Sequence, residues 1–212
     1  MRNDMKKLLY LVVALSFSSA HAGSYDDFFR AVVSDDSAAI RKLVALGFDP
    51  NSPDPKGQPA ITRALFAESP RAALTLARLP GTDPNVRNRS GETPLMVAAL
   101  KGEPEVALAL IERGAVIDPP GWTPLHYAAA GNSLPVLQLL LKRGAAVDAR
   151  APNGRTPLML AVLHASEEVI DALLLAGADP QARERNELTA ADLAQRAGRE
   201  RLALRLAALP AR

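Results

Sequence analysis

Five stretches of the chain carry apolar residues at helical spacing, and a glycine closes each stretch. Within a stretch the apolar positions follow one another at intervals of three and four residues, which places them on one face of a helix. The closing glycines are Gly47, Gly81, Gly114, Gly144 and Gly177. They are separated by 34, 33, 30 and 33 residues. A nearly fixed period in this range predicts a protein built from stacked repeats.

A nine-residue motif precedes three of these helices and predicts another helix in each repeat. It reads GETPLMVAA at 91–99, GWTPLHYAA at 121–129 and GRTPLMLAV at 154–162. Thr before Pro is typical of a helix start, because the hydroxyl can cap an open backbone N–H and Pro is tolerated at the first helical position. Gly102 or Asn132 then ends this first helix in a left-handed turn. Each repeat is therefore expected to be a pair of helices.

The motif and the Gly-Ala-Asp ending at 177–179 resemble the ankyrin repeat over roughly residues 24–208. The resemblance implies an all-α solenoid of about six helix-turn-helix units joined by hairpin-like fingers. The first, second and last units depart from the motif, and end repeats commonly do so because one side faces water. We expect an ankyrin repeat domain over 23–212, with units at about 24–52, 53–87, 88–117, 118–150, 151–183 and 184–212.

The first 22 residues have the layout of a secretory signal peptide. A basic start precedes the ten-residue apolar run 8–17, and the small residues Ala20 and Ala22 flank a cleavage site before Gly23. Ten residues are too few to span a bilayer, which needs about 20. We expect export to a bacterial periplasm, with secretion as the alternative. High Ala, Arg and Leu content favours a bacterial source.

Cleavage changes the charge of the protein. The whole chain has 25 basic and 23 acidic residues, and the signal removes three basic and one acidic residue, leaving 22 of each. A formally neutral chain gives no support to nucleic-acid binding. Cysteine is absent, which excludes disulfides and thiolate chemistry.

The candidates for chemistry are few. His126 occupies the motif histidine position, where the resemblance implies a structural hydrogen bond to the motif threonine, and His164 stands alone. Met96 and Met159 replace the motif histidine and are expected to fill its space by packing. No catalytic residue, cofactor site or metal site is predicted, because two separate histidines without cysteine do not form a zinc site.

The basic residues Arg196, Arg199, Arg201 and Arg205 are expected on a solvated outer face, with an anion site as the less favoured alternative.

The resemblance implies partner binding through the finger tips and the inner helix surface. Trp122 is the single tryptophan, and tryptophan is enriched among residues that dominate interfaces. The segment before it, 118–121, is three residues short and holds two prolines, which predicts a notch in the row of fingers. Packing against a neighbouring repeat is the alternative role for Trp122. The candidate contact residues are Arg89, Glu92, Lys101, Trp122, Tyr127, Asn153, Arg155, His164 and Arg185.

These observations predict a monomeric, non-enzymatic protein-protein interaction module that binds a protein partner through its concave face and fingers. No membrane contact is expected after signal cleavage. Two alternatives remain open: a secreted effector that binds host proteins, and a cognate inhibitor or protective partner of one periplasmic enzyme. The sequence does not specify the partner, since a fold does not determine function.

Overall fold

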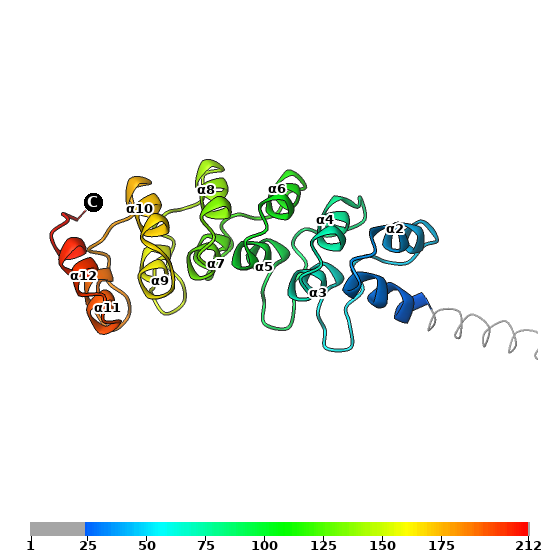
Figure 1. Ribbon diagram of the computed structural model, residues 1–212, viewed down its shortest axis with the longest axis horizontal. Coiled ribbons are helices and arrows are strands. Elements are labelled where there is room, and N and C mark those ends of the chain that lie inside the picture. Colours follow the sequence, from blue (N-terminus) through cyan, green and yellow to red (C-terminus); the bar gives the residue numbers. More distant parts are fainter. Residues whose placement is uncertain (1–23, 212) are drawn as a thin grey trace, which may run out of the picture. The chain divides into compact units, whose positions relative to one another are not determined.

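The computed structural model describes residues 24–211 and divides the chain into two compact units, Met1–Thr82 and Asp83–Arg212 (Figure 1). The predicted signal peptide at 1–22 lies outside the described residues. Within the described part, every regular element is a helix, apart from a single isolated bridge between Pro53 and Pro59. This confirms the predicted all-α fold of paired helices.

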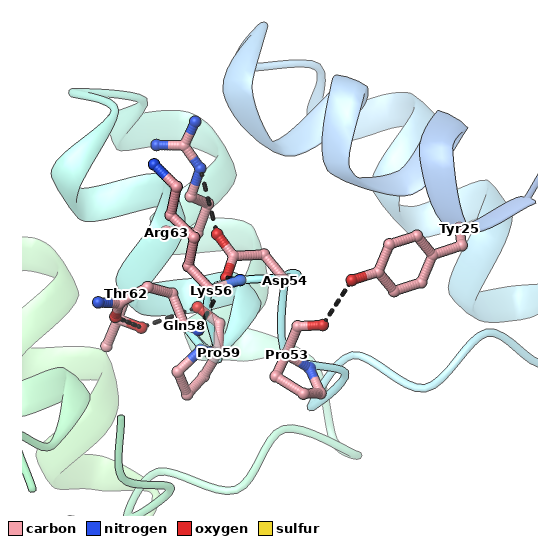
Figure 2. Close-up of polar contacts among 8 residues, drawn as sticks. All are labelled: Tyr25, Pro53, Asp54, Lys56, Gln58, Pro59, Thr62 and Arg63. Carbon is pink, nitrogen blue, oxygen red and sulfur yellow. Dashed lines mark hydrogen bonds and ion pairs between the residues drawn. The ribbon is translucent and has the colours of Figure 1, made fainter. Parts of the chain in front are cut away.

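The first unit begins with helical residues 24–33, followed by α2 (Ser37–Ala45), α3 (Ala60–Phe66) and α4 (Pro70–Arg78). Its core includes the fully buried Phe28, whose ring stacks on Phe48 with 4.2 Å between centroids. The hydroxyl of Tyr25 donates to the carbonyl oxygen of Pro53 at 2.7 Å, which ties the first helical segment to the following finger (Figure 2).

Asp54 closes that finger in the first unit (Figure 2). Its carboxylate accepts the backbone N–H groups of Lys56 at 2.8 Å and Gln58 at 2.9 Å, and lies 3.7 Å from the Arg63 guanidinium. Helix α3 starts without a capping threonine, as expected for a degenerate motif. Thr62 occupies the motif histidine position there and donates its hydroxyl to the carbonyl of Pro59 at 2.8 Å.

The second unit contains four helix pairs. The first helices are α5 (Pro94–Lys101), α7 (Pro124–Ala130), α9 (Pro157–His164) and α11 (Ala190–Arg196). The second helices are α6 (Pro104–Glu112), α8 (Leu134–Lys142), α10 (Glu167–Leu175) and α12 (Glu200–Ala207). Helix α7 packs between α5 and α9, and α8 packs between α6 and α10, so the two kinds of helix form separate rows (Figure 1).

The motif threonines start these helices largely as predicted. The hydroxyls of Thr93, Thr156 and Thr189 each accept the backbone N–H three residues on, at 3.4, 3.4 and 3.2 Å. Helix α7 is different. The N–H of His126 bonds the carbonyl of Thr123 at 3.0 Å, and the Thr123 hydroxyl contacts the His126 ring instead.

Small residues let the first helices of the second unit approach closely. Leu95, Ala98 and Ala99 on α5 are fully buried, as predicted for one helical face. At the end of α7 the approach is closer still. A Cβ atom at Gly131 would overlap the carbonyl oxygen of Leu100, so only glycine fits against the end of α5. Asn132 follows with a φ of 54°, the left-handed turn expected there.

A row of polar side chains links each repeat of the second unit to the next. These residues stand four positions after the closing glycines. Asn85 accepts the N–H of Val116 at 2.8 Å, Asp118 accepts that of Ala146 at 3.0 Å, and Asp148 accepts that of Asp179 at 3.0 Å. Backbone groups that neither helix uses are thereby satisfied between neighbouring repeats.

The prediction of a solvated arginine face on the last repeat is wrong for Arg199, which is half-buried, whereas Arg205 is exposed as predicted. The Arg199 guanidinium donates to the carbonyls of Val162 and Ala165 at the end of α9, at 2.9 Å each. Arg205 forms an ion pair with Asp171 on α10. Both guanidinium groups bond other groups of the protein, which argues against the anion-site alternative. In the described part of the chain, no helix has both the length and the apolar character needed to cross a membrane.

Candidate functional site

The short finger at 118–122 lies in the middle of the second unit. The fingers at 88–92, 151–155 and 184–188 share two backbone hydrogen bonds. In the first of them, the backbone N–H of Asn88 donates to the carbonyl oxygen of Glu92 at 3.0 Å, and the N–H of Gly91 donates to the carbonyl oxygen of Asn88 at 2.9 Å. Among the described residues, segment 118–122 makes neither bond. Its loop stays near the helices in Figure 1, whereas the loop before α5 extends well beyond them.

Trp122 follows this short finger and packs on a buried histidine. The indole is half-buried and meets the ring of His126 edge to face, with 5.4 Å between ring centroids. An edge-to-face aromatic pair of this kind contributes about 0.5–1.5 kcal/mol beyond its area burial. Trp122 therefore packs on a residue of its own repeat, and part of its surface stays accessible.

His126 is fully buried, and both ring nitrogens are occupied. Nε2 lies 3.1 Å from the carbonyl oxygen of Arg155 and must donate to it, so Nδ1 is the acceptor. Nδ1 accepts the Thr123 N–H at 3.2 Å and the Thr123 hydroxyl at 2.9 Å. Burial lowers the pKa of His126, and the hydrogen bond to the Arg155 carbonyl only partly opposes this. A neutral imidazole with no free nitrogen is a structural group.

Tyr127 and Glu92 form a second polar contact across neighbouring repeats. The Tyr127 hydroxyl donates to Oε1 of Glu92 at 3.2 Å, and the Asn88 amide donates to Oε2 at 2.7 Å. Burial, together with the Glu92 charge, raises the pKa of Tyr127 to about 12. The phenol is therefore neutral near pH 7 and is held beside Glu92, just before the start of α5.

These side chains surround a hollow of about 330 Å³, which we call the Trp122 hollow. It is lined by Leu100, Trp122, His126, Tyr127, Ala130, Arg155, Leu160 and His164. Its walls come from α5, α7 and α9 and from the finger residues Trp122 and Arg155. The volume falls at the lower end of the range for ligand pockets, about 300–1,000 Å³.

The structure brings together four of the nine predicted contact residues at this hollow: Trp122, Tyr127, Arg155 and His164. Glu92 joins them through its hydrogen bond with Tyr127. The other four lie elsewhere in the second unit. Arg89 and Arg185 are exposed on fingers, and Lys101 is exposed at the end of α5. Asn153 accepts the N–H of Arg155 at 3.1 Å, and its carbonyl accepts the Arg185 N–H at 3.1 Å.

Leu160 is the lining residue that the sequence reasoning missed. It occupies the same motif position in its repeat as Tyr127 does in the preceding one, four residues after the motif threonine. That equivalence is the signal that would have identified it. Within residues 24–211, no group of three or more His, Cys, Asp or Glu side chains is arranged to hold a metal ion.

These features define a helical repeat protein. Its helix pairs have first helices that begin at a motif threonine, and fingers and a row of polar side chains link the repeats. A family profile for ankyrin repeats in three copies matches residues 28–120 and 116–184. The chain belongs to the ankyrin repeat family, whose members are protein-protein interaction modules and are typically not enzymes.

Three curated relatives each match part of this chain. The chain is 43% identical over 82 residues to the B-cell lymphoma 3 protein homolog of Mus musculus, covering 37% of this chain and 18% of that protein. It is 38% identical over 58 residues to the BTB/POZ domain and ankyrin repeat-containing protein NPR3 of Oryza sativa, covering 27% and 10%. A glycerophosphocholine phosphodiesterase of Schizosaccharomyces pombe matches at 31% over 87 residues, covering 41% and 8%. The chain thus spans less than a fifth of the length of these relatives.

Proposed function

We propose that this protein is a non-enzymatic binding module that acts after export and holds a protein partner on the first helices and fingers of its second unit. The observation that carries the proposal is the Trp122 hollow, where the finger row is interrupted. An accessible aromatic surface lies there beside an arginine, and Trp, Tyr and Arg are the residue types that dominate binding energy at interfaces.

The chemistry of the hollow supports binding and gives no support to catalysis. His126 has both ring nitrogens engaged and a lowered pKa, so it has no lone pair or proton to exchange with a substrate. Tyr127, with a pKa of about 12, is a poor base at neutral pH. The groups at this site offer shape, aromatic surface and charge.

The place of action rests on the N-terminal sequence. The basic start, the apolar run 8–17 and the small residues before Gly23 support export, with the periplasm as the proposed location and release to the medium as the alternative. The neutral charge after cleavage supports a protein partner over nucleic acid. We propose that the mature chain works as a monomer, in which each copy offers one Trp122 hollow.

Affinity capture from cells that make the protein, with matched bait variants, tests this proposal. Trp122→Ala and His164→Ala alter the hollow, and Lys142→Ala alters an exposed residue at the end of α8. We expect the wild-type and Lys142→Ala baits to retain the same protein in stoichiometric amount. We expect both hollow variants to lose it by about tenfold or more, the typical effect of removing an interface hot spot.

Melting curves of the same baits separate binding from packing. If Trp122→Ala lowers the melting temperature but captures as much partner as the wild type, Trp122 is a packing residue only. Full capture by both hollow variants, with loss on Lys142→Ala, would move the binding surface to the second helices and overturn the proposed site.

A further inference from the structure

Arg155 brings a positive charge to the Trp122 hollow, and no acid of the described chain forms an ion pair with it. Arg155 stands on the finger 151–155 and is half-buried. Its Nε atom is fully enclosed and has no hydrogen-bond partner among the described residues. Its guanidinium forms no ion pair within residues 24–211. Buried charged groups in folded proteins are normally paired.

Glu92, the acid that contacts Tyr127 beside the hollow, already accepts hydrogen bonds from other residues of the chain. Both carboxylate oxygens of Glu92 accept hydrogen bonds, one from Tyr127 at 3.2 Å and one from Asn88 at 2.7 Å. No Asp or Glu is among the residues that line the hollow. The remaining titratable walls are the buried His126, the neutral Tyr127 and the exposed His164. Arg155 is therefore the permanently charged group that lines the hollow, while the Glu92 charge acts on Tyr127 from beside it.

The rest of the hollow is apolar. Leu100, Ala130 and Leu160 line it, together with the free surface of the Trp122 indole. A volume of about 330 Å³ suits one or two side chains of a partner. The guanidinium group of arginine is a planar fork that binds a carboxylate through two parallel hydrogen bonds. An apolar wall beside such a fork selects for an apolar group next to a carboxylate.

We propose that the Trp122 hollow binds a partner segment in which a large apolar side chain is adjacent to an Asp or Glu. The apolar side chain packs on Trp122 and Leu160, and the carboxylate pairs with Arg155. This inference rests on the proposed function and adds the chemical class of the partner. It also assigns Arg155 the role of specificity residue, because a neutral segment would offer its guanidinium no opposite charge.

Selection of peptides against the mature chain 23–212 tests the inference. A displayed library of random 12-residue peptides without tryptophan is selected on the wild-type chain, and the binders are synthesised. Their affinity is measured through the emission of Trp122, the only tryptophan of the chain. We expect binders to share an Asp or Glu beside an aromatic or large aliphatic residue.

Three variants locate the charge contact. Arg155→Met keeps an unbranched apolar stem but removes the charge, Arg155→Lys keeps the charge but removes the fork, and Arg143→Met changes an exposed arginine at the end of α8. We expect Arg155→Met to weaken the selected peptide by about tenfold or more, with a smaller loss for Arg155→Lys and none for Arg143→Met. Replacing the acid of the peptide by its amide should cause the same loss on the wild-type chain and little further loss on Arg155→Met.

The possible results separate this inference from the proposed function. Peptides that change Trp122 emission but carry no acid, or that bind Arg155→Met as well as wild type, overturn the acidic class and leave the binding site standing. Peptides that bind without changing Trp122 emission, or a selection that yields none, contradict the hollow as a peptide site and so contradict both. If Arg155→Met does not fold, the acid-to-amide comparison on the wild-type chain still decides.

Discussion

One motif position carries methionine in two repeats of the second unit and histidine or aspartate in the other two. The position lies three residues after the threonine that precedes a first helix. Met96 places its sulfur 3.4 Å from the Thr93 nitrogen, so it accepts a hydrogen bond there as well as filling the space. Asp192 accepts both the N–H of Thr189 at 2.8 Å and its hydroxyl at 2.7 Å. Only His126 also reaches the next finger, through the carbonyl of Arg155.

His126 should make the stability of the protein depend on pH. Burial lowers its pKa below the ordinary value of 6.5, so the unfolded chain takes up a proton before the folded chain does. The free energy of unfolding should therefore fall as the pH drops below about 6.5, by up to about 1.4 kcal/mol for each pH unit until the folded pKa is reached. Urea denaturation between pH 7.5 and 5 measures this slope.

The variant His126→Met isolates the effect, because methionine occupies the same position in two other repeats. Its slope over this pH range should be smaller than that of the wild type. His164→Met removes the other described histidine, at an exposed position, and is the control. Equal slopes for the wild type and His126→Met would show that the buried imidazole does not contribute.

At the scale of helices, the close approach of α7 to α5 depends on one glycine. Gly131 lies where α7 ends, and a Cβ atom there would overlap the carbonyl oxygen of Leu100. Its φ of −82° is ordinary, so the requirement for glycine comes from space and not from backbone conformation. A substitution must push the two first helices apart, and the hollow that they border would change with them.

Gly131→Ala should lower the free energy of unfolding by about 1–3 kcal/mol, the usual cost of overpacking a well-packed contact. Gly81→Ala is the matched control. A Cβ atom there meets only the side chain of Pro50, at an ordinary 3.5 Å. The control should stay within about 0.5 kcal/mol of the wild type. Chemical denaturation of both variants measures the difference. Equal stability would show that the contact between α5 and α7 accommodates a Cβ atom at position 131.

At the scale of the whole molecule, the sequence was sufficient for the fold because its signals are local. Thr-Pro starts and glycine ends act within a few residues, and they repeat. The hollow required contacts between repeats that spacing alone does not reveal. Arg199 was expected on a solvated face, yet it bonds carbonyls 34 and 37 residues away. Leu160 lines the hollow only because α9 packs against α7.

Export is a prediction for the whole chain. Produced from its full sequence in a bacterium, the protein should appear in the periplasmic fraction with Gly23 as its first residue. The signal-peptide layout is the physical basis, since its ten-residue apolar run is too short to remain as a membrane anchor. Intact mass and N-terminal sequencing of each fraction provide the measurement. Uncleaved protein in the cytoplasm would contradict export, and mature protein in the medium would favour secretion.

Site-specific photo-crosslinking in cells that make the protein tests the central claim most directly. A photoreactive amino acid is placed at position 164, on the exposed rim of the Trp122 hollow, or at position 142, on the exposed end of α8. We predict one discrete protein adduct from position 164 and none from position 142. An adduct from position 142 alone, or no adduct from position 164 while the partner still binds, would contradict the Trp122 hollow as the partner-binding site.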